Sequence, residues 1–136
     1  MDLTIRPLQE RDYENILVKW WNDWKWEAPA KDFLPDDGKG GLVVYDGDVP
    51  VCAGFLYITN SKVCWVDWII SNKEYREKPG RKIAKSVLIQ ALTDSAKNSG
   101  SKYAYALIKH NGLIATYQEA GYIKADNYNQ EMIKAL

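Results

Sequence analysis

The sequence lacks the features that mark a secreted or membrane-spanning protein. Its only cysteines are Cys52 and Cys64, too few for a disulfide scaffold. No apolar run approaches the roughly 18 residues that span a bilayer. The N-terminus, MDLTIRPLQERD, mixes acids and bases where a signal peptide needs a basic start and an apolar stretch. We therefore expect a soluble, unprocessed, cytoplasmic protein whose two thiols are free and buried.

The sequence also lacks an excess of charge of either sign. Its 18 Lys and Arg residues balance its 18 Asp and Glu residues, and the sequence pI is about 6.6. A neutral chain has no general attraction for nucleic acid or for an anionic membrane, so we expect neither partner. Basic residues still gather in one place, between residues 73 and 85.

Nothing divides the chain, since it has no internal repeat, low-complexity tract or linker. At 136 residues, 46% of them hydrophobic, it suits one domain with one core, over residues 1–136. Periodicity predicts strands at 3–5, 42–45, 51–58, 63–70, 103–108 and 131–136, and helices from about residue 12, at 81–98 and at 111–120. The order β-α-β-β-β-α-β-α-β predicts an α/β (α+β) fold with a mixed sheet that begins as an antiparallel meander.

The first helix is expected to begin at Asp12, which is a candidate N-cap. Its apolar stripe is formed by Tyr13, Ile16, Leu17, Trp20 and Trp24. Trp21 and Trp26 fall outside this stripe. Either they pack in the core and the following loop, or they are exposed and stack on a substrate or dock a protein.

Two turns set the register of the meander. Asp46-Gly47 predicts a hairpin, and the polar run TNSK separates the next two strands. A two-residue turn at Asn60–Ser61 would place Tyr57 opposite Cys64. Cys52 would then lie far along the ladder, so no disulfide is expected.

The stretch WIISNKEYREKPGRKIAKSVLIQAL joins an apolar strand to a helix through a basic turn. A helix N-terminus offers free backbone N–H groups and a partial positive charge, which suit a phosphate. Bases crowded at this end oppose the helix dipole, and an anionic ligand would relieve the conflict. The alternative is a solvated charged turn. The bases are Lys73, Arg76, Lys78, Arg81, Lys82 and Lys85.

A second stretch, HNGLIATYQEAGY, predicts a helix capped by Asn111 and stopped by Gly121. Tyr117 does not share one face with the apolar residues around it, so it need not belong to the core. A phenol and a thiol have broadly similar acidities, so Tyr117 is a candidate to protonate a departing thiolate. The alternative is a packed aromatic.

The two stretches together resemble the GNAT superfamily of acetyl-CoA-dependent N-acetyltransferases. Its members pair a turn bearing Arg/Gln-x-x-Gly-x-Gly/Ala with a later helix ending Tyr-x-x-x-Gly-Phe. Here the first reads YREKPGRKIA, from Tyr75 to Ala84, and the second reads YQEAGY, from Tyr117 to Tyr122. The opening Ile5-Arg6-Pro7-Leu8 with Asp12 is also similar, so the resemblance covers nearly the whole chain.

The resemblance implies helices on both faces of the sheet and acetyl-CoA as acyl donor, without a metal. Backbone groups of Ile69, Ile70 and Ser71 would pair with the pantetheine arm, in a slot where this strand splays from residues 103–108. Asn111 would bond the same arm, and Tyr117 would be the general acid. The pyrophosphate would be held by Arg76 and by the turn residues Gly80, Arg81, Lys82, Ile83, Ala84 and Lys85.

The general base is less well specified. Asp67 lies on the strand leading to the turn, where several family members carry an acidic base; an ordered water is the alternative. His110, the only histidine, lies nearer the cofactor slot than the acceptor amine. The turn also departs from the family pattern, because it has one glycine and because Pro79 supplies no N–H.

The resemblance therefore implies transfer of an acetyl group to a primary amine by direct attack in a ternary complex. The acceptor would be an amine of a small molecule or of a protein, and the tryptophan-rich segment would help to wall its groove. The alternative is a catalytically inactive GNAT-fold protein that binds or inhibits a partner. Whether the chain forms a homodimer stays open.

Overall fold

A computed structural model describes residues 1–136. The strands are β1 (Leu3–Pro7), β2 (Gly41–Asp46), β3 (Val49–Ile58), β4 (Val63–Ser71) and β5 (Tyr103–Tyr105). The α-helices are α1 (Val18–Asp23), α2 (Gly80–Asn98) and α3 (Asn111–Glu119). A π-helical turn (Tyr13–Leu17) precedes α1, and short 3-10 turns lie at Lys31–Phe33, Pro35–Gly38 and Lys73–Tyr75. None of the helices combines the length and hydropathy needed to cross a bilayer.

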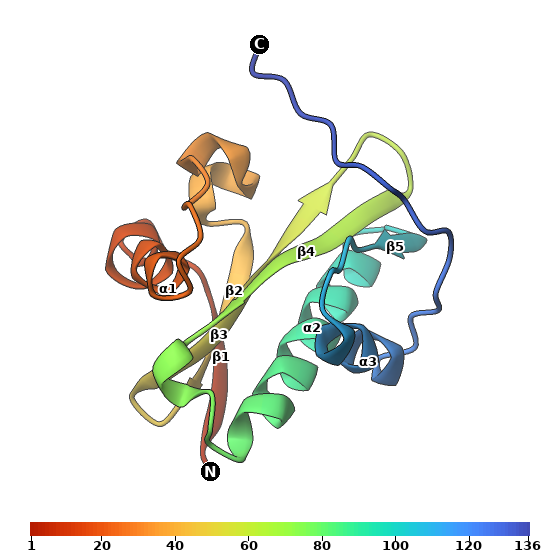
Figure 1. The fold of residues 1–136 in the computed structure, drawn as a ribbon. Coiled ribbons are helices and arrows are strands. Elements are labelled where there is room, and N and C mark those ends of the chain that lie inside the picture. The colour runs from red at the N-terminus through yellow and green to blue at the C-terminus, as the bar shows by residue number, and fades with distance from the viewer.

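The sheet has the order β1-β2-β3-β4-β5. Its first four strands are antiparallel, and β5 pairs parallel with β4 after the crossover through α2. Helix α1 covers one face of the sheet, and α2 and α3 cover the other (Figure 1). The predicted mixed, mostly antiparallel sheet with helices on both faces is therefore confirmed.

Each face of the sheet carries its own core, because successive strand residues point to opposite sides. Val43 and Ala53 belong to the core under α1, and their neighbours Val44 and Cys52 belong to the core under α2. Cys64 also lies in the second core, and both cysteines are buried and free, as expected.

The first helix differs from its prediction in two respects. Asp12 occupies the predicted N-cap position, but its side chain makes no capping bond; the carboxylate instead accepts two hydrogen bonds from Arg6, at 2.7 and 3.0 Å, and one from the Gln9 N–H. Trp21 is as buried as Trp20, because it lies four residues after the buried Leu17 and so shares its side of the helix.

The loop between β3 and β4 is longer than predicted. Ile58, rather than Tyr57, lies opposite Cys64. The reason is local hydrogen bonding: the Thr59 hydroxyl accepts from the Ser61 N–H at 3.1 Å and donates to the Val63 carbonyl at 2.6 Å. These bonds stabilise a four-residue loop, and the cysteines still lie far apart along the ladder.

The predicted strand at 131–136 is wrong. Residues 122–136 form no regular structure, and Met132 and Ile133 are largely exposed. Strand propensity is expressed only against a pairing partner, and residues 131–136 pair with no strand of the sheet. The strand predicted at 103–108 is also shorter, because β5 ends at Tyr105.

Candidate active site

Strand β4 carries a bulge at its centre. Ala53 pairs with Ile70 and Phe55 pairs with Asp67, so two residues of β4 oppose one residue of β3. Within the bulge, Trp68 has φ +56°, a left-handed conformation that costs an ordinary residue roughly 1–2 kcal/mol. Strained backbone conformations of this kind cluster at functional sites. Here the bulge changes the direction of β4 at Trp68.

Gly54 lies opposite the bulge and makes room for it. A Cβ atom at this position would come within 2.5 Å of the Ile69 side chain and 3.0 Å of the Leu92 side chain. A glycine inside an otherwise apolar strand is a signal for a bulge. The strand predicted at 63–70 has no bulge, although this signal could have located one beside Trp68.

Backbone pairing between β4 and its parallel neighbour stops before the bulge, and we call the unpaired region between the second half of β4 and residues 106–110 the gap. Strand β5 pairs only with the first three residues of β4, Val63 to Trp65. The chain then leaves β4 and reaches the start of α3 (Figure 1). The pairing therefore ends at the part of β4 where the GNAT resemblance implies that the strands splay.

Both predicted catalytic residues lie at this gap. The Asp67 carboxylate bridges it, accepting one hydrogen bond from the Trp68 N–H at 2.9 Å and another from the Leu107 N–H at 3.1 Å. The Tyr117 hydroxyl donates to the Val66 carbonyl at 2.6 Å. The carboxylate of Asp67 on β4 and the hydroxyl of Tyr117 on α3 are thus held at neighbouring residues of β4.

Burial changes the acidity of both groups. It raises the pKa of the Asp67 carboxyl, although the two amide hydrogen bonds oppose the shift. It also raises the pKa of the Tyr117 phenol, and the nearby Asp67 charge adds to this effect. Contrary to the prediction that Tyr117 need not be core, its ring is buried and packs edge-on against Tyr122.

The basic turn ends at the N-terminus of α2, next to the end of β4. No side chain caps this helix, and its first turn has no acidic residue. The Arg81 guanidinium donates to the Ser71 hydroxyl at 3.3 Å and to the Arg76 carbonyl at 3.4 Å, whereas its buried Nε has no partner. A buried guanidinium nitrogen without an acceptor fits a site that takes an anion.

Two cations concentrate positive charge here. Burial and the Arg76 charge lower the pKa of Arg81, while burial and the Arg81 charge lower the pKa of Lys85. Both shifts mean that the surroundings disfavour the protonated forms and would be relieved by an anion. Ser71, Arg81 and Lys85 are therefore the predicted cofactor residues that the structure brings together.

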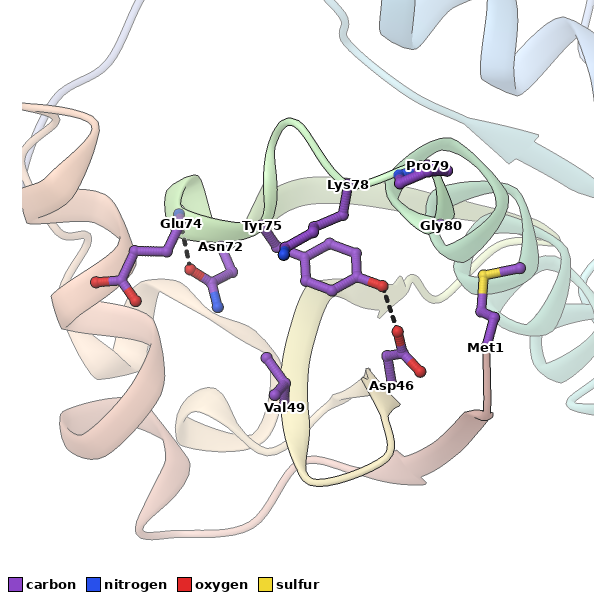
Figure 2. Close-up of a pocket in the computed structure, with 9 residues that line it drawn as sticks. All are labelled: Met1, Asp46, Val49, Asn72, Glu74, Tyr75, Lys78, Pro79 and Gly80. Atoms are coloured by element: carbon purple, nitrogen blue, oxygen red, sulfur yellow. Dashed lines mark hydrogen bonds between the residues drawn. The ribbon is translucent and has the colours of Figure 1, made fainter.

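A side chain at Gly80 would meet the ends of two neighbouring side chains. A Cβ there would come within 2.5 Å of the Met1 sulfur and 2.9 Å of the Tyr75 hydroxyl. Figure 2 shows Met1 beside Gly80, and Tyr75 directed toward Asp46, to which it donates a hydrogen bond. These four residues line a pocket of about 580 Å³ on the side of the α2 N-terminus that faces the β2–β3 hairpin.

The other predicted residues are more dispersed. Lys82 pairs with Glu119 of α3 at 3.6 Å, Arg76 pairs with Glu77 at 3.9 Å, and Ile83 is largely exposed. Ala84 is fully buried, so only its backbone faces the turn. The predicted cap at Asn111 is wrong: His110, in an extended conformation, is the cap residue, and no side chain caps α3.

Three aromatic rings connect the two sides of the gap. Trp24 stacks with Trp26 at 5.9 Å between ring centroids, and Trp26 stacks with His110 at 6.3 Å. The Trp24 indole N–H donates to the Ser71 carbonyl at 2.8 Å. The tryptophans and His110 each stand out in the sequence, but no local pattern joins residues so far apart in the chain.

Neither a protein-family model nor a curated protein matches this chain. Solved structures do. Glucosamine-6-phosphate N-acetyltransferase from Arabidopsis thaliana matches with a TM-score of 0.67 and 10% identity, over 98% of this chain and 100% of that chain. The ribosomal-protein-S18-alanine N-acetyltransferase from Escherichia coli matches with a TM-score of 0.66 and 15% identity, over 91% of this chain and 79% of that chain.

A third match contains a ligand. The structure of AAC(6')-Iy in complex with the bisubstrate analogue CoA-S-monomethyl-acetylneamine has a TM-score of 0.68 and 14% identity, over 99% of this chain and 100% of that chain. At identities this low, the similarity establishes the fold. The chain therefore has the fold of the GNAT acetyltransferases.

Proposed function

We propose that the protein is a cytoplasmic acyltransferase that moves an acetyl group from acetyl-CoA to a primary amine of a small molecule or a protein. The observation that carries this proposal is the junction at the end of β4. There a bulged strand, splayed from its neighbour, meets the uncapped and cation-rich N-terminus of α2. These features support a phosphate site at the start of α2 and, next to it along β4, a place for the pantetheine arm.

The phosphates of the donor would be held by Arg81 and Lys85, with the backbone amides of residues 80–85. The unpartnered Arg81 Nε supports this assignment. Lys82 would contribute less while it pairs with Glu119. Backbone groups of Ile69 to Ser71 and the exposed Asn111 would contact the pantetheine arm in the gap.

The chemical roles follow from the gap. The Trp68 N–H, at the bulge, would donate to the thioester oxygen as negative charge develops there. Asp67, whose pKa is raised, would accept the proton of the attacking amine. Its carboxylate now holds the Trp68 N–H, so it would have to release that group.

Tyr117 would donate a hydrogen bond, and then a proton, to the leaving thiolate. Its raised pKa keeps the phenol protonated at neutral pH, so the donor is always present. The same burial opposes complete ionisation, so Tyr117 would stabilise the leaving group more than it would accelerate the proton transfer itself.

The proposal is tested by incubating the protein with acetyl-CoA and a panel of amines: polyamines, amino sugars, amino acids and lysine-containing peptides. Thiol release that depends on one amine, with the acetylated product seen by mass spectrometry, would support it. The buried Cys52 and Cys64 should add little background to a thiol assay. Failure to bind CoA at all would overturn it.

A second candidate function is binding or inhibition without catalysis. It is favoured by the hydrogen bonds that already satisfy Asp67 and Tyr117 inside the protein. The same experiment separates the two: CoA binding without thiol release from any amine would favour the inactive protein.

A further inference from the structure

The rings of Trp24, Trp26 and His110, which we call the aromatic bridge, span the proposed cofactor gap. The interplanar angles are 21° for Trp24–Trp26 and 14° for Trp26–His110, so the three rings are nearly parallel. Parallel aromatic pairs at such separations attract one another beyond the burial of their surface. The bridge is therefore an interaction between the walls of the gap.

Each end of the bridge is fixed to a different wall. Trp24 is held to β4 through its hydrogen bond to the Ser71 carbonyl. His110 is the N-cap residue of α3, in the part of the chain that no longer pairs with β4. Trp26 joins the two and belongs to neither wall, since it lies in the loop after α1.

The backbone between the two tryptophans forms the C-cap of α1, in which the Trp26 N–H donates to the Trp21 carbonyl at 2.8 Å. Lys25 has φ +61°, in the left-handed region that residues with a side chain seldom adopt. This conformation reverses the chain sharply enough for Trp26 to stack on Trp24, two residues before it. This C-cap holds Trp26 beside Trp24 whether or not Trp26 contacts His110, so the Trp26–His110 contact is the part of the bridge that can open.

We propose that the aromatic bridge is a latch, which holds the gap closed in the free protein and must open between Trp26 and His110 before the acyl donor enters. This inference rests on the proposed function, because the pantetheine arm is what would occupy the gap. The latch also contacts the proposed phosphate site, since the Arg81 guanidinium lies 5.6 Å from the Trp24 ring. Phosphate binding at Arg81 would thus disturb one end of the bridge.

The latch is tested first without ligand. The Leu107 N–H is held across the gap by Asp67, so its hydrogen exchange reports opening. Trp26→Ala should make this amide exchange faster than in the wild type, whereas Trp26→Phe keeps a ring for stacking and should stay near it. Unchanged exchange at Leu107 in Trp26→Ala would overturn the latch.

The second measurement is CoA affinity by titration calorimetry. If the closed bridge competes with the donor, Trp26→Ala should bind CoA about 2- to 10-fold more tightly than the wild type. Equal or weaker binding, despite faster exchange, would overturn the latch and make Trp26 a structural or ligand-contacting residue. A wild type that binds no CoA would overturn both the proposed function and the competition, even if exchange responds.

Trp65→Ala is the matched control. It removes a comparable pair, Trp65–Tyr105, whose centroids are 5.0 Å apart where β4 and β5 are still hydrogen-bonded. Trp65→Ala should loosen β5 without increasing the affinity for CoA. If Trp65→Ala increases CoA affinity as much as Trp26→Ala does, then loosening anywhere along β4 explains the effect and the latch is overturned.

Discussion

The Tyr117 hydroxyl bonds to the Val66 carbonyl at the edge of the gap, and Tyr117→Phe removes this hydroxyl alone. We expect turnover to fall by about 10²-fold, the low end for a positioned acid, with little change in KM for acetyl-CoA. The unfolding free energy should fall by about 1–3 kcal/mol, since a buried carbonyl loses its partner. Steady-state kinetics and denaturant unfolding measure the two effects.

Tyr122→Phe is the control for this change. Tyr122 packs against Tyr117 and shares a 2.7 Å hydrogen bond with Thr93, away from the gap. Tyr122→Phe should therefore lower the unfolding free energy without lowering turnover. Wild-type turnover in Tyr117→Phe, with chemistry rate-limiting, would leave Tyr117 a packing residue.

Asp67 gives a prediction for pH. Its pKa is raised by burial, so the acidic limb of kcat/KM should lie above the ordinary aspartate range, and Asp67→Asn should remove it. The folded state also binds this proton more tightly than the unfolded state does. The unfolding free energy should therefore decrease as pH rises from the ordinary value through the raised one, and Asp67→Asn should abolish that decrease.

The two readouts for Asp67 are independent. A pH–rate profile that Asp67→Asn leaves unchanged would assign the base to a water or to another group. Unfolding curves across the same pH range would still report whether the carboxyl is buried as described. Asp126→Asn, on the exposed C-terminal segment, should affect neither measurement.

At the scale of elements, the N-terminus of α2 should control donor affinity. Arg81→Gln should weaken CoA binding by about 10- to 100-fold, the range for a charge-assisted hydrogen bond, and should flatten its dependence on salt. Lys82→Gln should weaken it less, because Lys82 pairs with Glu119. Calorimetry at two salt concentrations measures both.

Matched changes test whether position or charge matters. Lys97→Gln removes a cation from the last turn of α2 and should leave CoA binding unchanged. Glu119→Gln frees Lys82 and should tighten binding slightly. If Arg81→Gln and Lys97→Gln behave alike, the phosphates do not bind at the start of α2.

The elements also show where sequence reasoning succeeds. Periodicity located α2 and the antiparallel strands because each carries a long apolar face. It could not locate the end of β5 at Tyr105, which is set by the divergence of two chains rather than by composition. Nor could it foresee that residues 131–136 find no partner strand. Spacing predicts the basic turn and Tyr117 as site residues, and these stay predictions, whereas the bonds of Asp67 to Trp68 and Leu107 depend on tertiary contact.

At the scale of the molecule, the core under α2 predicts how the thiols behave, because both cysteines lie in it. Cys52 and Cys64 are fully buried, and burial raises the pKa of Cys52 to about 12. Native protein should therefore react slowly with thiol reagents, and denatured protein prepared without reductant should show two free thiols. An intramolecular disulfide would contradict the β3–β4 register, which places Cys52 opposite Ser71 and Cys64 opposite Ile58.

The π-helical turn before α1 has a consequence for the genetics of this protein. The Val18 N–H bonds to the Tyr13 carbonyl, five residues back, so the turn holds one residue more than an α-helical turn. Deleting a single codon within residues 13–17 would restore regular pairing and rotate the residues on either side of the turn relative to one another by about 100°. Trp20, Trp21 and Trp24 could then no longer face the sheet while Asp12 keeps its bonds to Arg6. Such a deletion keeps the reading frame, but we expect it to displace the tryptophans from the sheet. The number of residues in this turn therefore matters as much as their identity.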